Sequence, residues 1–537
     1  MSEGTIPKVD RRLVEVRRLD MRYPLPEYRT KEEWLRRASE LRLHMLVSLG
    51  LHPPLPRTPL NPRRVVCYED EDVVVERVAF ESLPGFFVTA NLYRPKRGRP
   101  PYPAFLHPHG HVPQPEGRLY ERERRRAMAM AKLGFVVLAY DMVGYGDNFQ
   151  VDHRAPETPV EHLWAISKGG IQTWNSMRAL DFLLSLPEVD KERVGCCGSS
   201  GGGTQTYFLA AVDDRVRAAA PVNMVSAHMQ GGCICENPPN LRVDTSNPEI
   251  TALAAPRPLL IISNGGDWTN EVPQYEFPFI KHIYELMGAP DRCENAHFPE
   301  KGHEFDAEMR EVYYTWAVKW FERGGRPTNE TAAEPEMKLP PAERLRVWGP
   351  GMPKPEDAPR WPDIVRYIVE RAKEKIEAMR PRTREELERF RGEMGPALRH
   401  ALCAEVPSRG EVVAVEAGSK GLNGIMARKL FLGRRGRGDR IPAILWEPAG
   451  GARRAALLVS DEGKGAFSGP GLEPQGLARA LVERGFAVLA VDPFLVGEAA
   501  GERRRDVKFF HTYNKSDAAE RVQDVITALA LLRDAFG

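Results

Sequence analysis

The stretch RVGCCGSSGGGTQT, residues 193–206, joins a short apolar run to a cluster of glycines around two serines. A Gly-x-Ser-x-Gly pattern fits it in one register, at residues 198–202, and that register puts Ser200 in the centre. Flanking glycines relieve crowding where a strand turns sharply into a helix, so the pattern is typical of an exposed nucleophile. Ser199 does not fit, because the pattern would then need glycine where the chain has Cys197. We therefore predict that Ser200 is a catalytic nucleophile.

The residues on either side of the turn fit this interpretation. Cys196 and Cys197 precede the turn on a β-type run, so we expect them to be small core residues and not catalytic thiols. The helix expected after the turn directs its free N–H groups at the reacting centre, and the N–H of Gly201 is predicted to be one oxyanion donor. A phosphate-binding loop is disfavoured, because no lysine follows the glycines in the required register.

Candidates for the acid and the base follow in the chain order Ser, Asp, His, which is typical of one class of serine hydrolases. The apolar run PLLIISNGG breaks at two glycines and presents Asp267 on a loop, where the alternative role is a helix N-cap. His303 stands on the glycine-led loop KGHEFD, whereas His297 lies inside a strand pattern. We predict Asp267 as the acid and His303 as the base, and we expect His297 to be a packed core histidine.

The loop in FLHPHGHV is expected to complete the oxyanion hole, with the backbone N–H of His111 as the second donor. The substrate pocket is expected to involve His109, Trp268 and the two cysteines of QGGCICENPP, Cys233 and Cys235. An aromatic wall of this kind suits an apolar or sugar-like group.

The same histidines and cysteines raise the question of a metal site. Alternate histidines at the end of a strand have no partner cluster in the sequence with the spacing of a zinc site, so we predict no metal and no cofactor. On this interpretation chelators leave the activity intact.

Short apolar strands alternate with helical patterns from residue 103 to residue 325, after an N-terminal helix at 30–51 and strands at 72–81 and 86–95. Such alternation indicates an α/β fold with a mainly parallel sheet and helices on both faces. We predict a catalytic domain at 1–325, a Pro-rich linker or wrapping segment at 326–363, and a second domain at 364–537.

Parts of the second domain resemble the first domain in sequence. KLGFVVLAYDMVGYGD (132–147) aligns with ERGFAVLAVDPFLVGE (483–498), and VSDEGKG stands where the first half has its His-Gly loop. At this spacing the counterpart of the elbow strand would begin beyond residue 537, so we expect a degenerate, incomplete and non-catalytic α/β half that covers the first domain or forms a homo-oligomer.

The composition restricts the partners. Lys plus Arg number 76 and Asp plus Glu number 74. The net charge is therefore too small to indicate binding to nucleic acid or to an anionic membrane. The opening MSEGTIPKVD lacks the apolar region of a signal peptide, and no segment approaches the roughly 18 apolar residues of a membrane span. Seven cysteines in a long chain are typical of reduced thiols. We expect a cytoplasmic protein that binds a small-molecule or carbohydrate ester.

Five stretches make residues 30–325 resemble the α/β-hydrolase superfamily, and within it the acetylxylan-esterase-like and dienelactone-hydrolase-like carboxylesterases: PGFFVTANLYRP, DMVGYGDN, SLPEVDKERVGCCGSSGGGTQT, APRPLLIISNGGDWT and KGHEFD. The resemblance implies Ser200 as nucleophile, Asp267 as acid and His303 as base. Dienelactone hydrolases carry Cys at the nucleophile position, so the serine here implies simple ester cleavage.

The resulting expectation is a serine carboxylesterase that acts on small acyl esters, such as acetyl groups on carbohydrate, through an acyl-enzyme intermediate. A peptidase of the prolyl-oligopeptidase type is an alternative, disfavoured because no all-β repeat domain precedes the hydrolase core. A catalytically inert binding module on a hydrolase fold is the other alternative, and the triad pattern opposes it.

Overall fold

The computed structural model describes residues 6–322, 324–325 and 330–536. The chain divides into two compact units. The large unit spans Leu19–Arg391, and the small unit combines Met1–Arg18 with Gly392–Gly537. Among the helices of the described residues, none is long and apolar enough to cross a bilayer.

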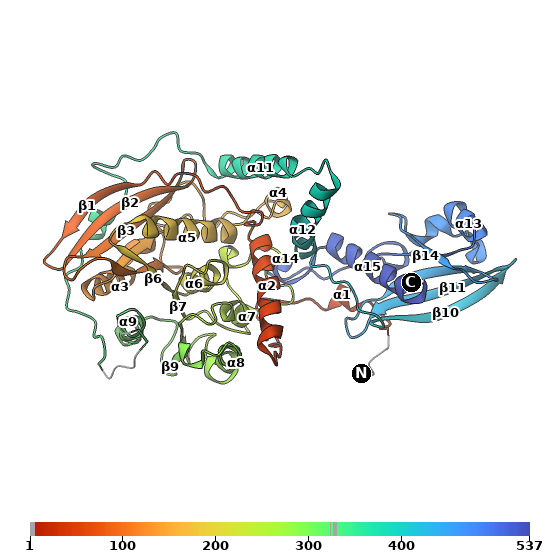
Figure 1. The fold of residues 1–537 in the computed structure, drawn as a ribbon, viewed down its shortest axis with the longest axis horizontal. Coiled ribbons are helices and arrows are strands. Elements are labelled where there is room, and N and C mark those ends of the chain that lie inside the picture. Colours follow the sequence, from red (N-terminus) through yellow and green to blue (C-terminus); the bar gives the residue numbers. More distant parts are fainter. Residues whose placement is uncertain (1–5, 323, 326–329, 537) are drawn as a thin grey trace. The chain divides into compact units, whose positions relative to one another are not determined.

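The described part of the large unit forms a nine-stranded sheet in the order β1-β2-β3-β5-β4-β6-β7-β8-β9 (Figure 1). Strands β1, β2, β3 and β5 pair antiparallel in succession, and every pair from β5–β4 to β8–β9 is parallel. The strands are β1 Arg63–Glu69, β2 Val73–Leu83, β3 Phe86–Pro95, β4 Tyr102–Pro108, β5 Val136–Tyr140, β6 Val189–Ser199, β7 Ala218–Val222, β8 Leu259–Asn264 and β9 Cys293–Phe298. The predicted α/β-hydrolase-like fold class is confirmed.

Helices cover both faces of this sheet, because each parallel strand returns through a crossover helix. One core contains buried side chains of α2, α5, α6 and α8, and the other contains those of α3 and α9. The helices of the large unit are α2 Lys31–Ser48, α3 Glu121–Lys132, α4 Pro159–Leu163, α5 Lys168–Ser185, α6 Gly201–Val212, α7 Asn247–Ala252, α8 Phe277–Leu286, α9 Ala307–Phe321, α10 Ala342–Leu345 and α11 Trp361–Ala378, and α12 Arg384–Ala401 crosses into the small unit.

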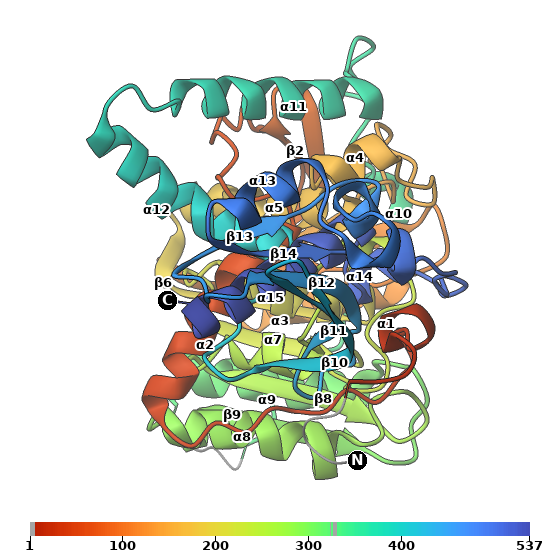
Figure 2. The same ribbon diagram turned by 90° about the vertical axis from the view of Figure 1, so that its right-hand side faces the viewer.

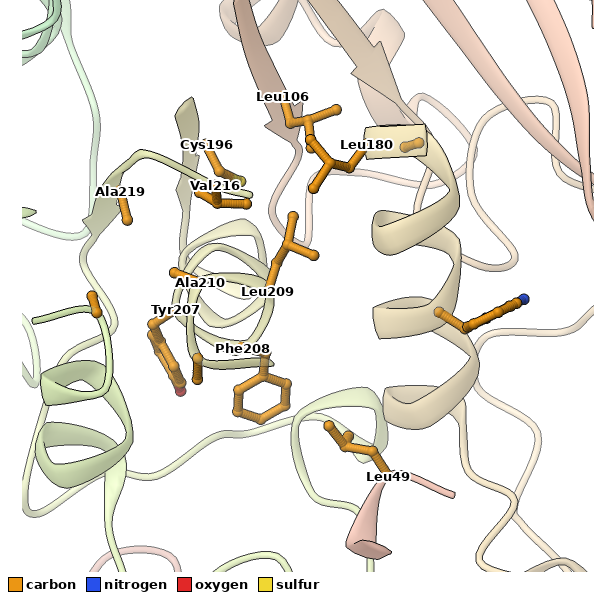
Figure 3. Close-up of a cluster of buried hydrophobic side chains, with 14 of the residues drawn as sticks. Leu49, Leu106, Leu180, Cys196, Tyr207, Phe208, Leu209, Ala210, Val216 and Ala219 are labelled. Carbon is orange, nitrogen blue, oxygen red and sulfur yellow. The ribbon is translucent and has the colours of Figure 1, made fainter. Parts of the chain in front are cut away.

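The helix that follows the predicted elbow, α6, is buried along its length because its residues are apolar or small. In Figure 3, Leu209 of α6 points towards Leu106 of β4 and Leu180 of α5. Cys196 and Cys197 of β6 are completely buried, as expected of core residues, and burial raises the pKa of each thiol to about 12. This packing fixes the start of α6 against the ends of the parallel strands.

The Pro-rich segment packs on the large unit over its described part, while residues 326–329 lie outside the described residues. Leu345 is completely buried, and its carbonyl oxygen accepts hydrogen bonds from Asn91 and Arg118. In α11, Ile364 and Ile368 join the core that contains α6. The large unit therefore extends to Arg391, beyond the predicted boundaries at 325 and 363, because apolar side chains and carbonyls of this segment find partners there.

The small unit contains a five-stranded sheet. Its sheet order, β10-β11-β12-β14-β13, follows the same pattern as β1-β2-β3-β5-β4, with one parallel pair between β13 and β14. Helices α13 and α15 contribute to separate apolar clusters on this sheet (Figure 2). The elements are β10 Val412–Leu422, β11 Ile425–Arg434, β12 Ile441–Pro448, β13 Arg454–Leu458, β14 Phe486–Val491, α1 Arg11–Val14, α13 Gly476–Glu483, α14 Phe510–Tyr513 and α15 Asp517–Phe536.

A buried aspartate follows the corresponding strand in each sheet, β5 in the large unit and β14 in the small unit. Asp141, after β5, accepts hydrogen bonds from the backbone N–H groups of Arg118 and Asp147. Asp492, after β14, accepts the corresponding bonds from Lys464 and Glu498. The two sheets therefore share this local arrangement, and the internal repeat stays a prediction. The N-terminal residues were predicted to lie with the catalytic domain, but they join the small unit through ion pairs of Arg12 with the carboxylates of α15.

Candidate active site

Ser200 occupies the sharp turn between β6 and α6. Its backbone has φ 57° and ψ −123°, which is unfavourable for a residue with a side chain, and it stands at the N-cap of α6. The Ser200 N–H donates to the Val222 carbonyl oxygen at 2.9 Å, which holds the strained turn in place. Ser199 is 2% exposed, whereas Ser200 is half-buried. The backbone geometry is that of a nucleophile elbow centred on Ser200.

Glycines allow the loop after β4 to approach this turn. A Cβ atom at Gly202 would lie 2.4 Å from the Pro108 carbonyl oxygen. A Cβ atom at Gly110 would lie 2.6 Å from the Ser199 carbonyl oxygen and 3.2 Å from the Ser200 Cβ. Contacts this short exclude any side chain, so both positions require glycine. The loop that was predicted to complete the oxyanion hole therefore lies against the elbow.

The two predicted oxyanion donors belong to residues in direct contact. Gly201 is the first residue of α6, so its N–H has no acceptor within the helix. A Cβ atom at Gly201 would lie 2.6 Å from His111 Cε1 and 2.7 Å from His111 Nδ1. The imidazole of His111 thus packs on the residue after Ser200. The role of both N–H groups in binding an oxyanion stays a prediction.

Asp267 and His303 form a hydrogen-bonded pair. His303 Nδ1 lies 2.8 Å from Asp267 Oδ2, and the other carboxylate oxygen accepts bonds from the Thr269 N–H at 2.7 Å and hydroxyl at 2.5 Å. In the tautomer in which Nδ1 donates to this carboxylate, His303 Nε2 carries a free lone pair. The Asp267 side chain is 2% exposed and that of His303 is 35% exposed. The buried carboxylate of Asp267 therefore orients the imidazole of His303, which remains accessible to solvent.

Topology brings the three predicted residues to one edge of the sheet. Ser200 follows β6, Asp267 follows β8 and His303 follows β9, and these strands run parallel in the order β6-β7-β8-β9. The carboxyl ends of parallel strands meet at the same edge, where ligand sites of open α/β sheets form.

Two asparagines that the sequence analysis missed hold the His303 loop. The Asn223 side-chain amide donates to the Glu304 carbonyl oxygen at 2.5 Å. The Asn264 amide donates to the Gly302 carbonyl oxygen and to that of Glu304, the latter at 3.1 Å. Each asparagine stands at the end of a buried parallel strand, in PVNM and in IISN, which is the sequence signal that could have identified them.

Trp268 lies beside the predicted base, and its place in the substrate pocket stays a prediction. Its ring centroid is 4.4 Å from that of His303 with an interplanar angle of 39°. The Trp268 indole N–H donates to the Asn223 carbonyl oxygen at 3.0 Å. The indole therefore has a fixed orientation next to the imidazole.

His109 and His297 differ from their predicted surroundings. His109 is completely buried, with Nδ1 2.7 Å from the Gly110 carbonyl oxygen and Nε2 2.9 Å from the Met142 N–H. Burial lowers the pKa of His109 to about 4. These contacts give His109 a structural role in place of the predicted pocket position. His297 lies in β9 as expected, but it is half-buried at the sheet edge and lies near Ser263 Oγ, 2.9 Å away.

The two pocket cysteines lie in a cluster with two histidines. The potential ligand atoms of His111, His153, Cys233 and Cys235 all lie within 4.8 Å of one another. The neighbouring Cys235 and two imidazoles lower the pKa of Cys233 far below its ordinary value, whereas burial raises that of Cys235. The prediction of no metal assumed that no such cluster forms, and that assumption is wrong. His153 was missed because nothing in VDHRAP links it to the other three.

The comparisons with known proteins find similarity to esterases and to a hydrolase. The family model described as Acetyl xylan esterase (AXE1) matches residues 64–228, a range that contains Ser200. The Putative hydrolase YtaP of Bacillus subtilis (strain 168) is 27% identical over 308 residues, 52% of this chain and 99% of that protein. The solved structure of Methylesterase BT1017 is 31% identical with a TM-score of 0.56, over 65% of this chain and 78% of that chain.

Proposed function

Since the chain belongs to the acetyl-xylan-esterase-like α/β hydrolases and is a serine ester hydrolase, we propose that Ser200, His303 and Asp267 are its catalytic triad. The observation that carries the proposal is the 2.8 Å contact between His303 Nδ1 and Asp267 Oδ2, at the same sheet edge as the strained Ser200 turn. A nucleophile on an elbow and a base oriented by a carboxylate are the groups that acyl transfer requires.

In the proposed mechanism, His303 Nε2 takes the Ser200 proton as Oγ attacks the ester carbonyl carbon. Asp267 keeps the imidazole in the required tautomer and stabilises the imidazolium that forms. The N–H groups of Gly201 and His111 would stabilise the oxyanion. Collapse of the tetrahedral intermediate breaks the bond to the alcohol, to which His303 returns the proton. Water then hydrolyses the acyl-serine with the same histidine as base.

Two ester classes fit this chemistry. The family model supports acetyl esters of carbohydrates, in which the sugar is the leaving alcohol and acetate is the acyl group. The longer match to a methylesterase supports methyl esters, in which methanol leaves and the carboxylic acid is the acyl group. We propose acetyl esters as the first candidate and methyl esters as the second. Trp268, fixed beside His303, would form an apolar wall for either substrate.

A product assay distinguishes the two classes. Acetylated xylan and a methyl-esterified uronic acid polymer are incubated separately with the protein, and released acetate and methanol are measured. We expect acetate release with a kcat/KM at least about tenfold above that for methanol release, a difference of about 1.4 kcal/mol. The opposite preference would establish the methyl esterase. A prolyl anilide serves as the control for the peptidase alternative, and its turnover without ester turnover would contradict both candidates.

We further propose that the small unit carries no catalytic serine and acts as a companion domain or an oligomer contact. Its sheet ends at β13, at the position where β4 of the large unit pairs with the elbow strand β6. Lys464 stands beside the buried Asp492 in the loop after β13, where the large unit has its His-Gly loop.

Labelling of the full chain with a fluorophosphonate tests this division. We expect one modified serine, Ser200, because the reagent needs a serine activated by a base and an oxyanion hole. Peptide mass spectrometry locates the label, and heat-denatured protein is the control for non-specific reaction. A label on any serine of residues 392–537 would contradict the proposal, and so would labelling at Ser199.

A further inference from the structure

The Cys/His cluster is defined as His111, His153, Cys233 and Cys235, and its four side chains have no role in the proposed acyl transfer. Its members come from three loops of the large unit, after β4, β5 and β7. His153 is 1% exposed and Cys235 is completely buried. Two thiols and two imidazoles converge on one point, so the cluster needs a chemical explanation.

The distances within the cluster approach those of a tetrahedral metal site. His111 Nε2 lies 3.3 Å from Cys235 Sγ, and His153 Nε2 lies 3.3 Å from Cys233 Sγ. Bonds of about 2.3 Å to sulfur and 2.0–2.1 Å to nitrogen at tetrahedral angles place ligand atoms about 3.3–3.8 Å apart. The widest pair in the cluster, at no more than 4.8 Å, has to shorten by about 1 Å on binding.

Neighbouring groups already orient two members of the cluster. His153 Nδ1 lies 2.6 Å from the Val143 carbonyl oxygen, so the proton is on Nδ1 and the lone pair of Nε2 faces Cys233. Glu236 accepts hydrogen bonds from the backbone N–H groups of Gly232 and Cys233, at 2.9 and 3.0 Å, and from the Thr204 hydroxyl at 3.1 Å. A carbonyl behind the histidine and a carboxylate that fixes the cysteine loop are typical supports of metal ligands.

We propose that His111, His153, Cys233 and Cys235 bind one Zn²⁺ ion that holds the loops after β4, β5 and β7 against the elbow. Two sulfur and two nitrogen ligands in tetrahedral arrangement suit zinc. Four protein ligands leave no open position for water or substrate, so the ion is structural and no step of the ester hydrolysis passes through it.

The position of His111 connects this ion to the active site. The edge of its imidazole that contains Nδ1 and Cε1 packs on Gly201, the residue after Ser200, while Nε2 points at Cys235. Coordination of Nε2 fixes the ring, and with it the backbone of the loop that carries the predicted His111 N–H donor. Loss of the ion is therefore expected to lower activity through a displaced loop, in contrast to the chelator resistance predicted from sequence.

Metal content tests the proposal independently of the catalytic assignment. The purified full chain is incubated with excess Zn²⁺ and dialysed, and the bound zinc is then quantified by elemental mass spectrometry. We expect about one Zn²⁺ per chain, and less than about 0.1 for Cys233→Ser and His153→Ala, because each removes one of four ligands. Cys67→Ser is the matched control, since Cys67 is a half-buried free cysteine outside the cluster, and it should retain the full content.

A spectroscopic measurement on the unmutated chain avoids dependence on how the variants fold. Replacement of zinc by Co²⁺ should give the intense visible bands of tetrahedral cobalt and a thiolate charge-transfer band. Absence of bound zinc in the wild-type chain, absence of those bands, or equal zinc loss in Cys67→Ser would each overturn the proposal. A count of free thiols two below the seven cysteines would also overturn it, because it would indicate a Cys233–Cys235 disulfide.

Discussion

Ser200→Ala is expected to lower kcat for ester hydrolysis by a factor on the order of 10⁴ to 10⁶, with the fold and the substrate KM nearly unchanged. The change removes the oxygen that forms the acyl-enzyme, and alanine is compatible with the space at the turn because it keeps the Cβ. The residual rate would come from the oxyanion donors and binding alone. Initial rates with p-nitrophenyl acetate, with melting temperature as the check on folding, measure the effect.

The neighbouring serine provides the matched control. Ser199 is 2% exposed and belongs to β6, whereas Ser200 is at the N-cap of α6 with its backbone at φ 57°. Ser199→Ala is therefore expected to keep kcat within about threefold of the wild type, a difference of less than 1 kcal/mol in transition-state stabilisation. If Ser199→Ala were inactive and Ser200→Ala active, the elbow would be assigned to the wrong residue.

His303→Ala is expected to have a comparable effect, a loss of kcat on the order of 10⁴ to 10⁶, because triad members act as a unit and do not contribute additively. Without Nε2 of His303, neither the attack by Ser200 nor the departure of the alcohol has a proton carrier. The side chain is 35% exposed, so its removal leaves no large buried cavity and should change the melting temperature little. Single-turnover kinetics would show whether acylation is the step that is lost.

His297→Ala is the control for this variant. His297 lies in the edge strand β9 near Ser263 Oγ, at 2.9 Å, and it precedes the loop that carries His303. Its replacement should lower the free energy of unfolding by about 0.5–1.5 kcal/mol, the ordinary net value of one hydrogen bond, and leave kcat within a few-fold. Equal catalytic losses in His297→Ala and His303→Ala, both with unchanged melting temperatures, would contradict the assignment of the base.

Much of the fold follows from local sequence patterns. The apolar run PLLIISNGG contains β8, which ends at Asn264 directly before the two glycines, and His297 lies in β9, as its strand pattern predicts. The register of GSSGG follows from the steric requirements of a strand-to-helix turn. It implies a positive φ at Ser200, and the structure has one. The sequential order of Ser, Asp and His let the acid and base candidates be proposed, although the triad itself awaits the kinetic tests above.

Other features depend on contacts between distant segments. His153 is 42 residues from His111 in sequence numbering, yet the two rings are 5.5 Å apart because β4 and β5 are neighbours in the sheet. The Pro-rich segment has no periodic pattern, but Arg310 pairs with Glu334 and the Leu345 carbonyl oxygen is bonded inside the large unit. No local rule predicts such pairings, since they arise only after the sheet has formed.

The sequence by itself determined the alternation of strands and helices in the large unit and the turn that carries Ser200, because hydrophobic periodicity and glycine sterics act between residues close in the chain. Only the tertiary structure decided that Asn223 and Asn264 hold the His303 loop, that His109 is buried, and that four residues form a Cys/His cluster. These depend on the order of the parallel strands, which brings loops distant in sequence to one edge of the sheet.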